Sequence, residues 1–178
     1  MLWPILDRIF DLKLIYKNTE EAIQQRKQFL MERGIGICDI VSSCNRVKID
    51  ASDLGMQDIK LRDILVYLEK YTTIHTLLFT GGNSKNGPEY LFRKLCKKQE
   101  ITLELISNQI PRIHQFKLPD SRKDKNYTSR IIKTVSLTAP SGAANRSIGS
   151  LTYYKQKKQK NPNYTTIDFR EEQYCKYF

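Results

Sequence analysis

The stretch RIIKTVSLTAPSGAANRSIG (residues 130–149) predicts a strand followed by a tight turn, and the rest of the fold is interpreted around it. Its first part is rich in β-branched and apolar residues, which predicts a strand over residues 130–138. Pro140 ends that strand because proline has no N–H to donate to a ladder. The Pro-Ser-Gly sequence then predicts a tight turn in which Gly142 can adopt positive φ. The small residues that follow would let another surface approach the backbone. An ordinary strand-to-loop connection in an α/β protein has the same pattern.

Positive charge is concentrated around this stretch. The 178-residue chain has a formal net charge of +11, and residues 112–163 contain twelve Lys or Arg residues against two acids. Such an imbalance predicts an anionic partner, either nucleic acid or an acidic membrane surface. A basic half around a tight turn suits a surface that follows phosphates, whose binding should weaken with salt. A lysine-rich surface that serves only solubility is the alternative.

The rest of the chain alternates predicted helices with short apolar strands. We predict helices over residues 2–14, 20–33, 58–70, 88–98, 147–160 and 167–178. Further strands are predicted over residues 73–80 and 101–106, and residues 35–41 form a short apolar stretch. Residues 108–129 are predicted to form a long connection or hairpin-like excursion that pairs with the 130–138 strand. This alternation predicts an α/β sandwich of three layers around a small, mostly parallel sheet.

Three segments carry a resemblance to a known family. The segment LTAPSGAANR (residues 137–146) resembles the second motif of the uracil-DNA glycosylase superfamily, in particular its mismatch-specific branch. WPILDRIF (residues 3–10) resembles the helix that follows the family's first motif, and GIGICDIV (residues 34–41) resembles its GIGLxD segment. An aromatic and basic C-terminal helix is a further similarity. Because these segments follow one another in the family's order, the resemblance implies a single uracil-DNA glycosylase-like domain over residues 1–178.

The resemblance also implies two sets of site residues. In that family the Pro-Ser-Gly loop enters the minor groove and pinches the phosphates while the damaged base flips out. The implied DNA-binding residues are Pro140, Ser141, Gly142, Ala143, Ala144, Asn145 and Arg146. The implied residues on the floor of the base pocket are Ile37, Cys38 and Asp39.

For some of these residues, a purely structural role is the alternative to a role in binding. Arg146 is the first choice for a minor-groove or phosphate contact, but it could instead pair with an acid of a neighbouring helix. Asn145 is a candidate donor to the base, where the classical uracil enzymes have a histidine. Asp39 is the only acid on a mostly apolar run, so it is either functional or a helix cap or buried hydrogen-bonding group.

The implied function is that of a DNA repair glycosylase, which flips a deaminated base such as uracil or hypoxanthine and hydrolyses its N-glycosidic bond. The partner would be DNA that contains a damaged or mismatched base, and no metal or other cofactor would be needed. The first motif positions the attacking water and lies upstream of the helix that residues 3–10 resemble. We therefore identify no catalytic residue and expect that motif and its strand to be missing. The alternative is a nucleic-acid-binding remnant without turnover.

The sequence gives little support for a metal site, a membrane segment or a nucleotide-binding site. The four cysteines form no CxxC pair and are accompanied by only two histidines, so we expect free thiols and no zinc site. No signal peptide or transmembrane run is visible, and we expect a cytoplasmic monomer without a membrane partner. A third hypothesis is a nucleotide-binding α/β enzyme with a crevice at Gly81 and Gly82, although no phosphate-binding glycine motif accompanies them.

Overall fold

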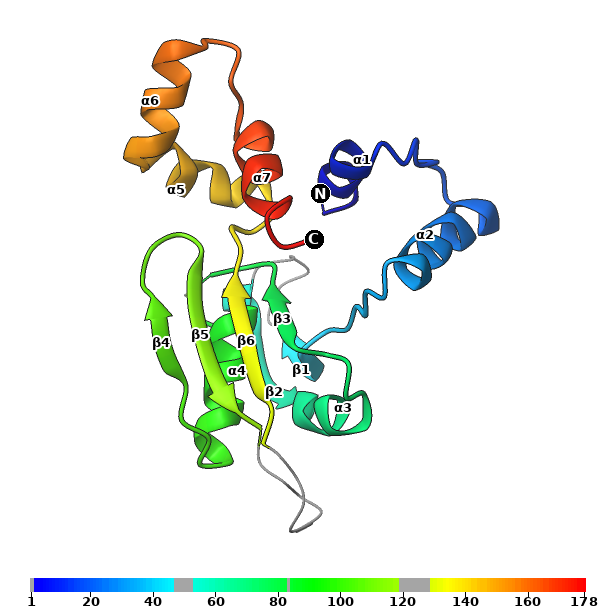
Figure 1. Cartoon of the computed structure of the whole chain (residues 1–178), viewed down its shortest axis with the longest axis vertical. Helices are drawn as coiled ribbons and strands as arrows, with labels where there is room; N and C mark the ends of the chain where they lie inside the picture. Colours follow the sequence, from blue (N-terminus) through cyan, green and yellow to red (C-terminus); the bar gives the residue numbers. More distant parts are fainter. Residues whose placement is uncertain (1, 47–52, 83, 119–128) are drawn as a thin grey trace. The chain divides into compact units, whose positions relative to one another are not determined.

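Mixed α/β structure confirms the predicted fold class. The computed structural model of the chain describes residues 2–46, 53–82, 84–118 and 129–178 (Figure 1). Two compact units are present: unit 1 combines Met1–Asp39 with Pro140–Phe178, and unit 2 is the continuous segment Ile40–Ala139. A single domain that spans both units stays a prediction.

Unit 2 is built on a mixed sheet of four strands. Their order across the sheet is β3 (Thr76–Phe79), β6 (Ile131–Ser136), β5 (Arg112–Lys117) and β4 (Glu104–Ser107). β3 and β6 are parallel, whereas the β6–β5 and β5–β4 pairs are antiparallel. The prediction of a mostly parallel sheet is therefore wrong. Residues 112–117, which we predicted as part of an excursion, form a full strand, and its pairing with β6 confirms the hairpin-like alternative.

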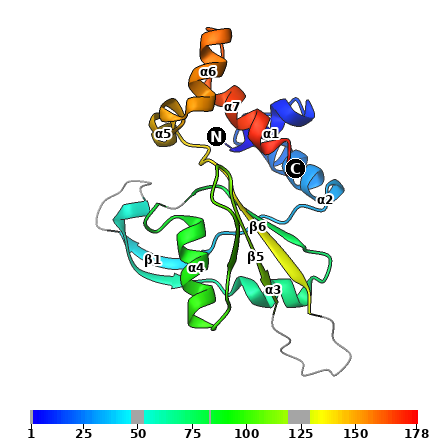
Figure 2. The same cartoon turned by 60° about the vertical axis from the view of Figure 1, so that its left-hand side comes forward.

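Helix α4 (Pro88–Lys98) covers one face of this sheet, as the two views in Figures 1 and 2 show. Pro88 occupies the first turn, where its missing N–H costs no hydrogen bond. Phe92 on α4 is fully buried between Phe79 and Phe116, with ring centroids 5.1 and 5.7 Å apart. Ile132 lies opposite Phe116 on the same sheet face, so these residues form the centre of the unit 2 core.

The segment before the sheet differs from the prediction. Residues 35–40 are coil, and the strand begins only at β1 (Val41–Arg46). β1 pairs antiparallel with β2 (Met56–Leu61), where we predicted the start of a helix. The reason is periodicity: Ile59 and Leu61 are two residues apart and face the core together, which is strand spacing. The helix itself, α3 (Ile64–Lys70), begins after Asp63, whose carboxylate accepts a hydrogen bond from the Leu65 N–H.

Unit 1 is helical in its described part. Its N-terminal helices are α1 (Leu2–Phe10) and α2 (Glu20–Glu32), and its C-terminal ones are α5 (Asn145–Ser150), α6 (Thr152–Lys160) and α7 (Thr166–Tyr174). Thr19 caps α2, and Gly34 with φ of +62° follows its last residues, as predicted for a glycine stop. α1 packs on α7. A small core of Ile148, Leu151, Tyr154, Tyr164 and Phe169 joins α5, α6 and α7.

The predicted helix over residues 147–160 is two helices. Leu151 has extended backbone angles and separates α5 from α6. Before it, the Ser147 hydroxyl donates to the Ala144 carbonyl and the Ser150 hydroxyl donates to the Ser147 carbonyl. Serine side chains that bond to nearby carbonyls compete with regular helical bonding, which favours a break at this point. The half-buried Leu151 side chain fills the small core at the joint.

Candidate nucleic-acid interface

The predicted turn lies on the surface of unit 1. After Ser141, which is extended, residues Gly142–Ala144 form one turn of 3₁₀-helix that continues directly into α5. Ser141, Gly142, Ala143, Asn145 and Arg146 are exposed, while Pro140 and Ala144 are half-buried. An exposed backbone with small side chains can be approached closely by a partner. The turn thus meets the condition that a contact with a polyanion requires.

Gly142 does not use the positive φ that is open to a glycine in this turn. Among the described residues, Gly34 is the glycine with positive φ. Because the chain enters a 3₁₀ turn here, ordinary negative φ values suffice. A Cβ placed on Gly142 would meet no atom of the protein within 4 Å. The protein therefore does not need glycine at this position for its own packing.

A buried arginine of α7 holds the turn in place. Arg170 has a relative exposure of 0%. Its guanidinium donates to the Ser141 carbonyl at 2.8 Å, to the Asn145 side-chain oxygen at 2.9 Å and to the Thr166 carbonyl at 3.1 Å. Burial lowers the pKa of this guanidinium. One side chain thus fixes both the start of the turn and the first residue of α5.

The contact with Arg170 also sets the orientation of the Asn145 amide. A guanidinium can only donate, so the amide oxygen rather than the NH₂ group must be the atom that faces it. Asn145 is itself exposed. The contact with Arg170 therefore occupies the acceptor of this amide and leaves its donor group unused.

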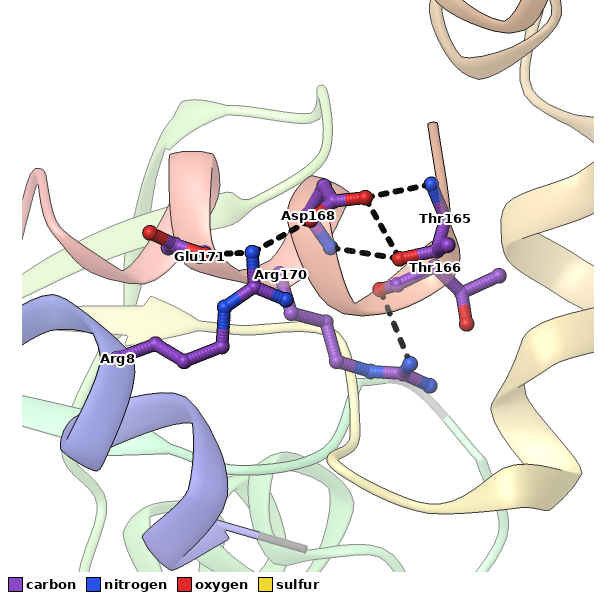
Figure 3. Close-up of polar contacts among 6 residues, drawn as sticks. All are labelled: Arg8, Thr165, Thr166, Asp168, Arg170 and Glu171. Atoms are coloured by element: carbon purple, nitrogen blue, oxygen red, sulfur yellow. Dashed lines mark hydrogen bonds and ion pairs between the residues drawn. The ribbon is translucent and has the colours of Figure 1, made fainter. Parts of the chain in front are cut away.

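Helix α7 is fastened at its N-terminal end by two devices (Figure 3). Thr165 and Asp168 form a capping box, in which the Asp168 carboxylate accepts from the Thr165 N–H at 2.7 Å. Arg8 of α1 reaches between Asp168 and Glu171 and forms ion pairs of 2.6 and 2.8 Å. These contacts position the helix that carries Arg170.

The capping carboxylate makes unit 1 sensitive to acid. Burial opposes a low pKa for Asp168, but hydrogen bonds from Thr165 and the Arg8 ion pair outweigh it, so the pKa lies below its usual value. A carboxyl with a depressed folded-state pKa contributes stability above its unfolded pKa of about 4, and this contribution is lost as pH falls through the folded value. We expect Asp168→Asn to flatten the loss of stability between about pH 5 and 2 in urea unfolding. An unchanged acid profile would contradict this role.

The predicted base-pocket residues are not arranged as a pocket floor. Ile37, Cys38 and Asp39 are all exposed, in the coil that follows α2. The two cavities that we characterised, both in unit 2, include none of them, nor Gly81 or Gly82. We expected the apolar run of residues 35–41 to lie on the floor of a base pocket, but within it only Ile40 is buried. Only the turn, of the two predicted site segments, has a geometry suited to its role.

The basic residues of the 112–163 region divide into several groups. Arg122, Lys123 and Lys125 lie outside the described residues. Four others bind within the protein: Arg112 pairs with the buried Glu89, Lys157 pairs with Glu172, Lys158 donates to backbone carbonyls, and Arg130 donates to carbonyls at and after the end of α3. Of the remaining cations of this region, Arg146, Lys155 and Lys160 are exposed on unit 1, and Lys117 and Lys133 are exposed on unit 2. The charge available beside the turn is therefore smaller than the sequence count suggests.

Sequence reasoning missed Arg170 entirely. The residue lies in a segment, TIDFREEQY, whose three acids predict an exposed charged helix face. The neighbouring residues in the sequence do not distinguish a solvent-exposed arginine from one like Arg170, which binds a carbonyl 29 residues earlier in the chain. The one available signal was the two aromatic residues, Phe169 and Tyr174, which mark part of this helix as buried.

Within the described residues, no three His, Cys, Asp or Glu side chains cluster so that they could hold a metal ion. The helices of this same part of the chain are too short or too polar to cross a membrane. Searches with the chain find no matching family model, no matching curated protein and no matching solved structure.

Proposed function

We propose that this chain acts on DNA as a repair glycosylase of the uracil-DNA glycosylase type. In this proposal the protein is a three-layer glycosylase-like fold that excises a deaminated base, uracil or hypoxanthine. The observation that carries it is the exposed turn of residues 141–146, which the buried Arg170 holds in place through hydrogen bonds to Ser141 and Asn145. A turn that is both accessible and held rigidly is suited to press on a DNA backbone while a base is flipped.

Two further features support DNA as the partner. Arg146 follows the turn, is exposed, and could contact a phosphate or the minor groove. The Asn145 amide oxygen accepts from Arg170, so the amide NH₂ group is not used in that contact. A cation and an amide donor next to small residues provide backbone contacts together with one group able to recognise a base edge.

A second candidate is a nucleic-acid-binding protein without excision. The exposed position of Ile37, Cys38 and Asp39 favours it, because these residues do not enclose a base in the described structure. Excision needs donors that stabilise the charge on the leaving base in a site that excludes water. Binding needs only the turn and the cations beside it.

An oligonucleotide assay separates the two candidates. The whole chain is incubated with a duplex that carries one uracil or one hypoxanthine, and abasic sites are then cleaved with alkali. Strand scission at the lesion supports the glycosylase, whereas salt-sensitive binding without scission supports the second candidate. An undamaged duplex is the control, and an absence of both binding and scission would refute the two candidates together.

Substitution of Gly142 tests whether the partner touches the turn. We expect Gly142→Ala to leave the melting temperature unchanged, because the added methyl group meets no protein atom. DNA affinity should fall by about tenfold if the backbone is approached closely, since tenfold corresponds to about 1.4 kcal/mol of lost contact. Fluorescence anisotropy with a labelled duplex measures the affinity. Equal affinities for both proteins would show that the turn is not the contact.

Arg146 offers a test through salt dependence. Loss of one phosphate contact should reduce the slope of log K against log salt by about 0.9. We expect this change for Arg146→Gln, measured by anisotropy over a range of salt concentrations. Lys27→Gln, an exposed cation on α2, is the matched control and should leave the slope unchanged. Identical slopes for Arg146→Gln and the wild-type chain would exclude a phosphate contact.

A further inference from the structure

A cleft in unit 2 lies between α4 and the segment that leads into β4. Its volume is about 850 Å³. One wall is a stripe of α4 that contains Arg93, Lys94 and Lys97, with Tyr90 at the same helical spacing. The opposite wall is aliphatic and includes Leu103 and Leu105. The cleft belongs to neither of the sites predicted from the sequence.

The strand beside this cleft is an edge of the sheet. β4 pairs with β5, and no other described strand pairs with it. Leu105 is 52% exposed and Ile106 is 51% exposed. An edge strand with two large exposed aliphatic side chains is normally covered or protected by charge, because it invites another strand to pair. Leu105 lies opposite His114 in the ladder, and both side chains line the cleft.

The charge of the cleft selects among possible occupants. Three cations line it, against one acid, Glu100. Burial lowers the pKa of His114, which favours its neutral form. The Lys94 ammonium lies 4.8 Å from the centroid of the Tyr90 ring, which keeps that cation on the cleft wall.

We propose that this cleft binds an extended acidic segment of a partner protein, which pairs as an added strand with the open edge of β4. Main-chain hydrogen bonds to β4 would supply affinity, and alternate side chains of the segment would face the α4 cations. A second copy of this chain fits less well because its net charge is +11. Nucleic acid would not use the bare strand edge or the aliphatic wall of Leu103 and Leu105.

The test uses the whole chain and a fluorescein-labelled acidic peptide, DVEVDVE, with blocked ends. Three probes are compared: this peptide, a lysine version KVKVKVK, and a DVEVDVE peptide that is N-methylated at alternate residues. N-methylation keeps charge and side chains but removes the donors that an added strand needs. We expect saturable binding of the first probe only, with at least about tenfold weaker binding of the methylated one.

Two protein variants locate the site. Lys94→Glu combined with Lys97→Glu should weaken peptide binding at least about tenfold, whereas Lys98→Glu, an exposed lysine of α4 outside the cleft, should preserve most of it. The proposal is overturned if the peptide does not saturate, or if N-methylation has no effect. It is also overturned if both lysine variants bind equally, or if a 20-nucleotide DNA strand displaces the peptide and itself loses affinity in the double variant. Circular dichroism confirms that each variant is folded.

Discussion

Replacement of Arg170 by methionine is expected to lower the free energy of unfolding by about 3 kcal/mol and to weaken DNA binding at the same time. The side chain is fully buried and donates to Ser141, Asn145 and Thr166. Methionine replaces the aliphatic stem of the arginine but not its guanidinium, so the loss comes mainly from the acceptors left without their donor. Urea unfolding gives the stability, and anisotropy at a temperature where the variant is folded gives the affinity.

The control for this experiment is Arg8→Met. That arginine also binds α7, through Asp168 and Glu171, but it is largely exposed to solvent. Exposed ion pairs contribute at most about 1 kcal/mol, so a much smaller loss is expected. If the two variants lose equal stability, the burial of Arg170 does not explain its contribution to the free energy of unfolding. If Arg170→Met keeps full DNA affinity, the turn does not need its anchor in order to bind.

Replacement of Phe92 by alanine is expected to cost about 4 kcal/mol, because a fully buried ring is removed from the centre of the unit 2 core. The cavity would lie between Phe79 and Phe116, whose rings are held by the sheet and cannot move far to fill it. Thermal or urea unfolding checks the value. Because this loss is a large share of the stability of an ordinary domain, partial unfolding of unit 2 at 37 °C is also expected.

Leu105→Ala is the matched control in the same unit. It also truncates a large apolar side chain to a methyl group, although it removes half as many carbon atoms, and that side chain is half exposed, so the expected loss is below about 1 kcal/mol. A loss as large as that of Phe92→Ala would mean that the β4 edge is part of the core, and it would weaken the case for a peptide site there.

The sequence predicted those elements whose signals are local. Helix α4 has proline in its first turn and a clear apolar face, and its predicted bounds are those observed. The Ile131-rich strand was also correct, because β-branched residues and a following proline suffice to mark it. In contrast, β2 was assigned to a helix because its apolar residues precede those of α3 without a strong break, and the strand spacing of Ile59 and Leu61 is too short a signal without the pairing with β1.

The candidate site was predictable only in part, for the same reason. The turn of residues 141–146 is a local pattern of small residues, and the structure places it at the surface. The role of Arg170 depends on a contact between segments far apart in the chain. The use of Arg130 is similar: it looked like a cation for phosphates, but its donors satisfy carbonyls of Leu68, Thr72 and Ile74. Charge counted along a sequence overestimates what a surface offers to a partner.

The division of the chain gives unit 2 the connectivity of an insertion. It is a continuous run from Ile40 to Ala139, entered from Asp39 and left at Pro140, and both of these residues belong to the segments that we predicted as functional. While unit 2 is folded, its own structure fixes the separation of its ends. Once it melts, 100 residues of loose chain join Asp39 to Pro140, and keeping those ends near each other costs entropy that grows with the logarithm of that length. Melting of the inserted segment should therefore loosen the turn as well, and a duplex bound tightly at the turn should raise the melting temperature of unit 2.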